Sequence, residues 1–167
     1  MKVKVKKLSE NAVISSYAKE GDAGLDLVAT SKSTDRDGNI VYGTGLAFEI
    51  PKGYVGLLFP RSSNAKTNLI LTDSVGVIDS GYRGEVTFKF KCLHYRIINY
   101  LSWWWHKYVL KKEIQNAEIH MFFHNPYEVG NRIGQLVIVK HPYIELVESE
   151  ELSETERGKG GYGSTGD

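Results

Sequence analysis

Short stretches of β-branched and aromatic residues, interrupted by turns that contain glycine, run through most of this chain of 167 residues. Such stretches are typical of β-strands, and glycine tolerates the backbone conformations of tight turns. Many short strands with glycine turns favour a sandwich or a jelly roll, so we expect an all-β fold. The predicted strands are residues 3–8, 25–29, 46–50, 54–59, 85–90, 119–123 and 136–140.

One region departs from this strand pattern. Residues 93–117 contain all three tryptophans and several basic residues. The spacing of Ile97, Leu101, Trp104 and Tyr108 predicts a short helix. The segment is too short and too polar to span a bilayer. Because an aromatic surface is costly to expose, we expect it either to pack on its own domain or to bind a partner protein.

Composition limits the remaining classes. The length predicts one domain, which we place at residues 1–152 with a flexible tail at 153–167. A net charge of +1 favours neither stable nucleic acid binding nor membrane attachment. Cys92 is the only cysteine, which excludes a disulfide framework and fits a reducing compartment. Because the N-terminus alternates and lacks an apolar signal core, we predict a cytoplasmic protein.

The C-terminal residues 157–167 combine five glycines with an arginine, an aromatic ring and two hydroxyl groups. Glycine-rich backbone can turn successive N–H groups towards an anion, and an aromatic ring can stack on a base. This composition fits a lid that closes over a nucleoside triphosphate. A disordered glycine-rich end has the same composition, so both interpretations stay open.

Asp79 is the candidate general base. It ends the apolar run 76–78 and begins a turn, where a carboxylate at the rim of a half-buried strand can hold a water for attack. The alternative is a turn aspartate that bonds its own backbone. Tyr82, three residues later, could pack against a sugar and leave no room for a 2′-hydroxyl group.

Three other segments carry candidate phosphate-binding groups. Arg61 and Ser62 follow an apolar strand and can bond phosphate oxygens. Asp26 lies between apolar residues and therefore needs a cation or a donor. A salt bridge to an arginine such as Arg61 and a contact with the water shell of Mg²⁺ both satisfy this need, and the two interpretations are compatible. Gln135 can donate and accept at once, or it can simply close a turn.

Five motifs in this order resemble the trimeric dUTP pyrophosphatases, the dUTPase family. They are residues 23–27, 60–63, 76–84, 132–135 and 157–166, and the resemblance covers the chain except for about 93–117. It implies a distorted jelly roll, a homotrimer with active sites built from three chains, and Mg²⁺-assisted hydrolysis of dUTP to dUMP and pyrophosphate. That reaction would limit uracil in DNA and supply dUMP for dTMP synthesis, in a bacterial or phage-infected cell.

The family pattern also implies roles for single residues. Asp79 would activate the water that attacks the α-phosphate, and Tyr82 would exclude ribose. The backbone of a hairpin would recognise uracil, and other side chains would hold the triphosphate. The implied base-binding residues are Gly76, Val77, Ile78 and Thr87, and the implied phosphate-binding residues are Arg61, Ser62, Ser63 and Gln135.

The implied roles extend to the metal and to the tail. Asp26 would act on the water shell of Mg²⁺, held mainly by the substrate phosphates, or would orient Arg61. The tail would close from a neighbouring chain, with Tyr162 over the base. Arg157, Gly163, Ser164 and Thr165 would then lie near the phosphates. Gly134 stands where alanine is usual, and Asp73 stands where some members carry asparagine.

Two alternative functions compete with dUTP hydrolysis. A sister family with the same fold deaminates dCTP and needs a glutamate at the position that Lys89 occupies, so no general acid or base is available here. We also expected Glu85 to face away from the site. The other rival is a protein-interaction module at residues 93–117, since some phage-encoded relatives carry an insert near this place that contacts regulatory proteins.

Overall fold

Ten short strands and one 3₁₀ helix make up the computed structural model, which describes residues 1–92 and 127–161. The helix, η1 (Ser62–Lys66), follows the sixth strand. The strands are β1 (Lys4–Lys7), β2 (Leu25–Val28), β3 (Ser31–Thr34), β4 (Ile40–Gly43), β5 (Leu46–Glu49), β6 (Tyr54–Pro60), β7 (Leu69–Leu71), β8 (Gly76–Ile78), β9 (Thr87–Cys92) and β10 (Arg132–Lys140).

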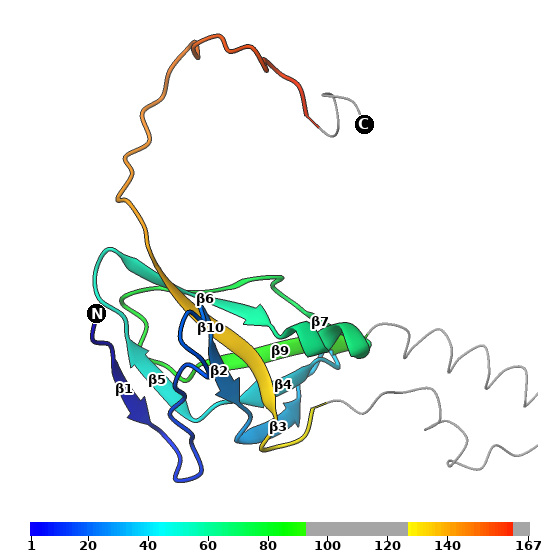
Figure 1. Cartoon of the computed structure of the whole chain (residues 1–167). Coiled ribbons are helices and arrows are strands. Elements are labelled where there is room, and N and C mark those ends of the chain that lie inside the picture. The colour runs from blue at the N-terminus through cyan, green and yellow to red at the C-terminus, as the bar shows by residue number, and fades with distance from the viewer. Residues whose placement is uncertain (93–126, 162–167) are drawn as a thin grey trace, which may run out of the picture.

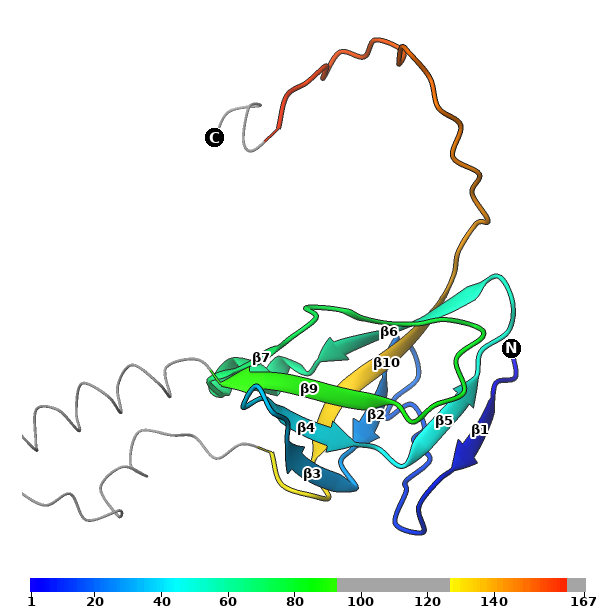
Figure 2. The same ribbon diagram turned by 180° about the vertical axis from the view of Figure 1, so that it is seen from behind.

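Two four-stranded sheets, with the orders β2-β10-β6-β8 and β3-β4-β9-β7, form the body of the domain. The pair β1-β5 adds a two-stranded ribbon, and every strand pairing is antiparallel. Figure 1 shows the sheet that contains β10 towards the viewer, and Figure 2 shows β9, β4 and β3 on the opposite side. The predicted all-β class is confirmed. The predicted helix and the predicted strand 119–123 lie outside the described residues.

The core lies between the inner faces of the two sheets. In β9 burial alternates along the strand, so Phe88 and Phe90 point inward while the residues between them stay exposed. The Phe88 and Phe90 rings stack with centroids 6.3 Å apart, and Tyr42 packs edge-on to Phe90 at 6.0 Å. Burying one such side chain contributes about 1.5–3 kcal/mol, so this aromatic group anchors the sandwich.

The two sheets approach each other closely where Gly134 of β10 faces Phe88 of β9. A Cβ atom at Gly134 would lie only 2.0 Å from the Phe88 ring. No side chain larger than hydrogen fits at residue 134 while Phe88 keeps its place. The glycine found where alanine is usual is therefore explained by the phenylalanine that faces it.

Six of the predicted strands correspond to observed strands, but four strands were not predicted. The segment of β3 is Ser-Lys-Ser-Thr and fully exposed, so it carries no apolar alternation. It is a strand because it pairs with β4, from Ser31 opposite Gly43 to Thr34 opposite Ile40. The others, β4, β7 and β8, have only three or four residues each, too few for a periodic pattern to stand out.

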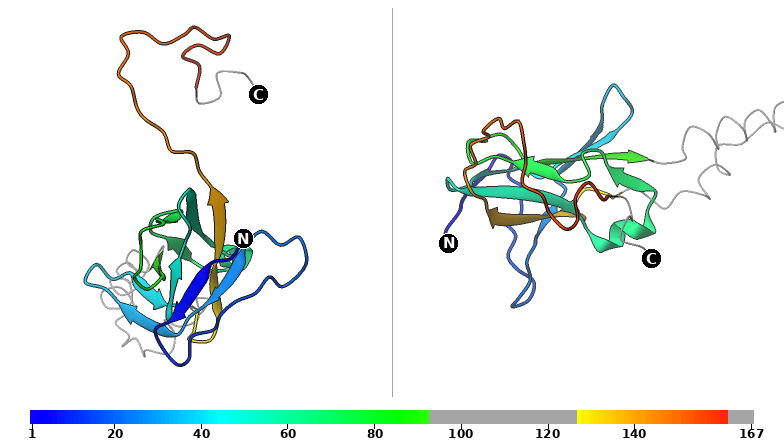
Figure 3. Two further views of the ribbon diagram at one scale, coloured as in Figure 1. Left: turned by 90° about the vertical axis from the view of Figure 1, so that its left-hand side faces the viewer. Right: turned by 90° about the horizontal axis from the view of Figure 1, so that it is seen from above.

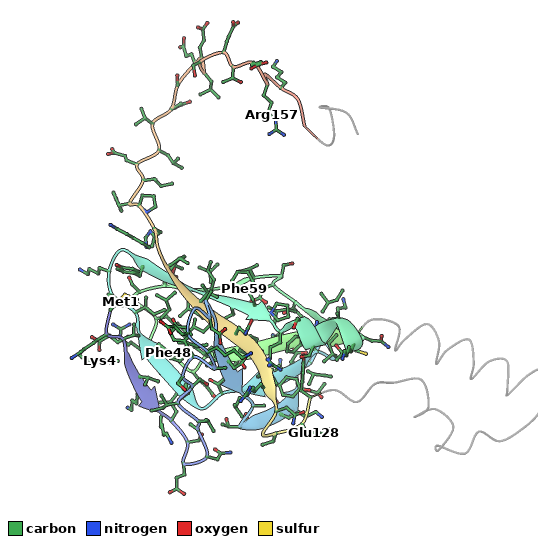
Figure 4. The ribbon with its side chains drawn as sticks, in the orientation of Figure 1. Met1, Lys4, Phe48, Phe59, Glu128 and Arg157 are labelled. Atoms are coloured by element: carbon green, nitrogen blue, oxygen red, sulfur yellow. The ribbon has the colours of Figure 1, made fainter. Side chains whose placement is uncertain are left out.

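After β10 the chain leaves the sheet and runs away from the body as an extended arm, residues 141–161 (Figures 1 and 3). The arm exposes large apolar side chains, including Tyr143 at 94%, Leu146 at 90% and Leu152 at 89%. Figure 4 shows Arg157 near the end of this arm. The chain leaves the sheet at His141, directly after β10. The boundary that we placed at residue 152 stays a prediction.

Candidate active site

A pocket of about 250 Å³ lies where β8, the loop after it and β9 meet. Six of the predicted site residues line it: Gly76, Val77, Ile78, Asp79, Tyr82 and Thr87. Leu58, Asp73 and Glu85 complete the wall. The geometry therefore gathers in one place the residues to which base, sugar and water were assigned from the sequence.

The backbone of β8 forms one wall of this pocket. In the part of the chain that the structure describes, this strand is the edge of its sheet and pairs with β6 alone, Gly76 opposite Leu58 and Ile78 opposite Gly56. An edge strand keeps one row of N–H and C=O groups outside the ladder. A Cβ atom at Gly76 would lie 3.1 Å from Leu58 Cβ and 3.2 Å from Asp73 Oδ2, so glycine keeps this wall open.

The predicted hairpin of residues 76–78 with Thr87 is wrong in its pairing. The strand β8 pairs with β6, whereas Thr87 begins β9 and pairs with Gly43 of the other sheet. The two segments approach each other at the edges of different sheets. Residues 79–86 bridge that gap as a loop, which leaves room between the segments for a flat ring.

Asp79 directly follows β8 at the mouth of the pocket and is exposed. Its carbonyl oxygen accepts a hydrogen bond from the Tyr82 N–H at 3.0 Å, which closes the turn. Among the described residues, its carboxylate forms neither a hydrogen bond nor an ion pair. A carboxylate that is not used by its own turn can accept a proton from water.

Tyr82 is held across the following loop. Its hydroxyl group donates to the Glu85 carbonyl oxygen at 3.0 Å. Its ring covers Gly84 so closely that a Cβ atom there would lie 2.4 Å from the Tyr82 hydroxyl oxygen. The ring is 44% exposed as a residue and lines the pocket, so one face is free to contact a sugar.

A second group of polar side chains lies around Asp26, which is 16% exposed in its side chain. Asp26 Oδ1 accepts from Arg61 Nε at 2.9 Å and from Gln135 Nε2 at 3.1 Å. Asp26 Oδ2 lies 3.4 Å from both Arg61 Nη2 and Arg132 Nη1. We call these four residues the Asp26 cluster. Because it contains two arginines and one carboxylate, the cluster carries a net positive charge.

The sheet register explains why the Asp26 cluster forms. Gln135 on β10 is paired with Asp26 on β2 and with Phe59 on β6, two residues before Arg61. A register shift between Arg132 and Gly134 brings the Arg132 side chain to the same carboxylate. The sequence predicted the Asp26–Arg61 pair as one alternative, but it assigned no role to Arg132.

The residues after Arg61 form η1. Ser62 is exposed, whereas Ser63 Oγ is buried and has no hydrogen-bond partner among the described residues. A buried hydroxyl group without a partner is costly, so Ser63 has an unused donor beside the Asp26 cluster.

The pocket and the Asp26 cluster lie at different ends of β6. Ile78, next to Asp79, pairs with Gly56, which is five residues before Arg61. At about 3.3 Å per residue this corresponds to roughly 16 Å along the strand. Asp79 and Arg61 therefore lie near different ends of β6 within one chain.

Comparison with known proteins identifies the family. The dUTPase family model matches residues 10–101 and 105–166. The deoxyuridine 5′-triphosphate nucleotidohydrolases of Nautilia profundicola and Hydrogenobaculum sp. are 39% and 36% identical, and each alignment covers 99% of both chains. The chain belongs to the dUTPase family.

Solved structures of dUTPases have the same fold. The dUTPase of Staphylococcus bacteriophage 80alpha, solved with dUpNHpp, is 32% identical, with a TM-score of 0.74 and coverage of 99% of both chains. A variant dUTPase of phage phi11 of S. aureus is 27% identical, with a TM-score of 0.65 over 90% of this chain and 98% of that one. Its description includes the coordination of a structural Mg(II) ion.

Only part of the dUTPase tail is within the described residues. Arg157 Nε donates to the Gly160 carbonyl oxygen at 3.1 Å, and Gly158 adopts a φ of 50° in the turn between them. The other predicted tail residues, Tyr162, Gly163, Ser164 and Thr165, lie outside the described residues, as does the 93–117 insert.

The geometry gives no support to the deaminase alternative. Lys89 Nζ lies 3.0 Å from Asp35 Oδ2, and Lys89 does not line the pocket. Glu85 is one of the residues that line the pocket, which was not expected from the sequence. Its Oε1 atom, however, accepts the Gly45 N–H at 2.7 Å, so this carboxylate is engaged by the fold.

Within 1–92 and 127–161, no three His, Cys, Asp or Glu side chains lie where they could hold a metal ion together. The same residues contain no helix that is long and apolar enough to cross a membrane.

Proposed function

We propose that this chain hydrolyses dUTP to dUMP and pyrophosphate, with water attacking the α-phosphate. The observation that carries the proposal is the pocket at the edge of β8, where the residues assigned to base, sugar and water line one wall. Membership of the dUTPase family supplies the substrate class.

Recognition of the nucleoside follows from the pocket walls. The unpaired backbone groups of β8 bond the edge of uracil, and the narrow space beside Gly76 excludes a base with an added methyl group. The Tyr82 ring packs against C2′ of the sugar and rejects a 2′-hydroxyl group. A 2′-hydroxyl group would clash with the ring and lose its hydrogen bonds to water, so ribose is disfavoured.

Asp79 acts as the general base. Its unengaged carboxylate accepts a proton from the attacking water, and pyrophosphate is the leaving group. General base catalysis by a positioned side chain contributes typically about 10²–10⁴-fold to the rate.

The Asp26 cluster binds the triphosphate. Asp26 fixes the Arg61 and Gln135 side chains, so both are held in place before the substrate arrives. Donors fixed in this way lose little freedom when they bond phosphate oxygens. Arg132 and the unused Ser63 hydroxyl group extend the same surface.

Magnesium fits this site as an ion carried by the substrate. Mg²⁺ keeps several waters and prefers substrate phosphates to all-protein cages. Both Asp26 oxygens already accept hydrogen bonds, which supports orientation of Arg61 over direct metal ligation. When bound, Mg²⁺ would neutralise charge on the triphosphate, and Asp26 would reach it only through water.

The active form is a homotrimer whose sites are shared between chains. Two observations support this. Asp79 and Arg61 lie near different ends of β6 within one chain, and the 141–161 arm exposes apolar side chains that a neighbouring chain can cover. The tail would then close over the substrate of another subunit, with Tyr162 on the base. The reaction would remove dUTP from the cytoplasm, limit uracil in DNA and supply dUMP for dTMP synthesis.

The test is pyrophosphate release from dUTP, with dTTP, dCTP and UTP as competitors, with and without Mg²⁺. Selective cleavage of dUTP that Mg²⁺ stimulates supports the proposal. A folded protein that leaves dUTP intact contradicts it, and ammonia release from dCTP would indicate the deaminase alternative.

The 93–117 insert keeps its separate hypothesis of a protein partner. The phage 80alpha dUTPase, a structural neighbour, is described among phage dUTPases that control transfer of virulence genes. Deletion of residues 93–112 with a short bridge should spare dUTP hydrolysis and alter partner binding or trimer stability. A trimeric deletion variant without hydrolysis would show that the insert serves catalysis.

A further inference from the structure

The loop between β8 and β9 is fastened to the turn between β4 and β5 at two adjacent residues, through the side chain of Glu85 and through the backbone of Val86, whose N–H donates to the Leu46 carbonyl oxygen at 2.8 Å. Glu85 Oε1 accepts the Gly45 N–H at 2.7 Å, which connects this loop to the turn between β4 and β5. Gly45 has a φ of 64°, and its N–H can point at the carboxylate because the turn is left-handed there. A charge-assisted bond of this length is among the stronger polar contacts of the chain.

The space for the Glu85 carboxylate is made by a second glycine. A Cβ atom at Gly43 would lie 2.5 Å from Glu85 Oε1 and 2.5 Å from Ser31 Oγ. Any side chain at residue 43 would therefore push the carboxylate away from the Gly45 N–H. Gly43 lies on β4, outside the set of residues that line the pocket.

The backbone of Glu85 serves the other side of the loop. Its carbonyl oxygen accepts the Tyr82 hydroxyl group at 3.0 Å, while the Tyr82 ring lies across Gly84. The side chain of Glu85 thus fixes the residue whose carbonyl oxygen fixes Tyr82. The path runs from the β4–β5 turn through Glu85 to the ring that faces the sugar.

We propose that Glu85 is a positioning residue that sets the Tyr82 ring and thereby the preference for deoxyribose over ribose. This inference rests on the proposed function for its substrate, and it adds a residue that touches neither the phosphates nor the attacking water. Without the Gly45 contact, Glu85 and the loop residues before it can shift while Val86 stays paired with the β4–β5 turn, so the ring can retreat from C2′ and the site then tolerates a 2′-hydroxyl group.

The test compares Glu85→Ala with Glu85→Gln, whose amide oxygen can still accept the Gly45 N–H. The readout is the ratio of kcat/KM for dUTP to kcat/KM for UTP. We expect the ratio to fall about tenfold in Glu85→Ala, the usual effect of losing one hydrogen bond to a charged group. Glu85→Gln should stay near the wild type. Glu49→Ala, at an exposed glutamate paired with Lys4, is the matched control.

A second variant protects the test against a folding failure. Gly43→Ala displaces the carboxylate without removing it, and Ser31→Ala controls for the other contact at that position. Gly43→Ala should lower the ratio as Glu85→Ala does, whereas Ser31→Ala should not. An unchanged ratio in both Glu85→Ala and Gly43→Ala overturns the inference.

Hydrogen exchange at the Gly45 amide separates this inference from the proposed function. Loss of protection in Glu85→Ala, with retention in Glu85→Gln, shows that the carboxylate fastens the loop whether or not dUTP is hydrolysed. If the wild type leaves dUTP intact, the proposed function fails. The anchoring role of Glu85 is then tested by the exchange rate of the Gly45 amide and by the NMR signals of the Tyr82 ring. If both are the same in Glu85→Ala as in the wild type, the inference is overturned.

Discussion

The pocket and the Asp26 cluster are built in opposite ways. The pocket depends on groups that have no partner among the described residues, namely the outer edge of β8 and the Asp79 carboxylate. The Asp26 cluster depends on groups that are already paired, with Arg61, Gln135 and Arg132 converging on one carboxylate. A chemical change in the pocket should therefore remove activity and spare stability, whereas a change in the cluster should affect both.

The largest effect is expected at Asp79. Asp79→Asn keeps the shape of the turn but removes the proton acceptor, so kcat should fall by about 10²–10⁴-fold. The melting temperature should not change, since the carboxylate has no partner among the described residues. Steady-state kinetics and thermal unfolding measure the two quantities. Asp37→Asn, at an exposed loop aspartate, is the control, and unaltered turnover in Asp79→Asn would refute the base assignment.

Removal of residues 157–167 tests whether the pocket and the Asp26 cluster support full activity without the tail. We expect kcat/KM for dUTP to fall roughly a hundredfold, because a misplaced substrate loses much of the benefit of orientation. The β-domain and the proposed trimer should remain intact by light scattering and circular dichroism. Loss of the folded trimer would show that the tail is structural.

Asp26→Ala should affect activity and stability together. Arg61 and Arg132 then lose their shared anion, and we expect the free energy of unfolding to fall by about 3 kcal/mol and KM for dUTP to rise about tenfold. Urea unfolding and kinetics provide the measurements. Glu128→Ala breaks an exposed pair with Lys32 and should change unfolding by less than about 1 kcal/mol. Equal effects in the two variants would contradict the cluster's role.

A smaller effect is expected at the contact between the sheets. Gly134→Ala places a Cβ atom against the Phe88 ring, and overpacking of this kind costs about 1–2 kcal/mol. Adding Phe88→Leu should recover part of that loss, because leucine has no ring at this point. Urea unfolding of the two single variants and the double variant tests this coupling. Additive effects would show that the two residues do not restrict each other.

The smallest effect is expected at Asp35, which belongs neither to the pocket nor to the Asp26 cluster. The Asn39 side chain, followed by Lys89, holds the pKa of Asp35 well below its usual range. A carboxyl group with a lowered pKa stabilises the fold above its unfolded value of about 3.9, and that contribution is lost as the pH falls. Asp35→Asn should therefore flatten the stability profile below about pH 4. Identical acid unfolding of both proteins would contradict this.

The sequence predicted the part of the site whose residues are close together in the chain, namely the pocket beside β8. Residues 76–82 are consecutive, so their pattern places Gly76, Asp79 and Tyr82 close together before any fold is known. The Asp26–Arg61 pair was one of two alternatives, because a lone acid between apolar residues requires a partner but does not name it. Arg132 could not be assigned, because its contact with Asp26 depends on the register shift in β10.

The missed parts of the fold share a physical reason. The strand β3 has no apolar residue and is a strand only because β4 pairs with it. The contact between the Glu85 carboxylate and the Gly45 N–H was also not predicted, because nothing in the local sequence around Glu85 indicates Gly45 as its partner. Contacts between residues about forty positions apart are set by topology, and a single sequence does not contain that information.

Subunit complementation is the most direct test of the shared active site. Chains with Asp79→Asn and chains with Arg61→Gln, each inactive alone, would be co-assembled in equal amounts. If Asp79 and Arg61 act on one dUTP from different chains, random trimers should recover about one quarter of the wild-type sites. If both residues act within one chain, the mixture should stay inactive, and that result would contradict the account.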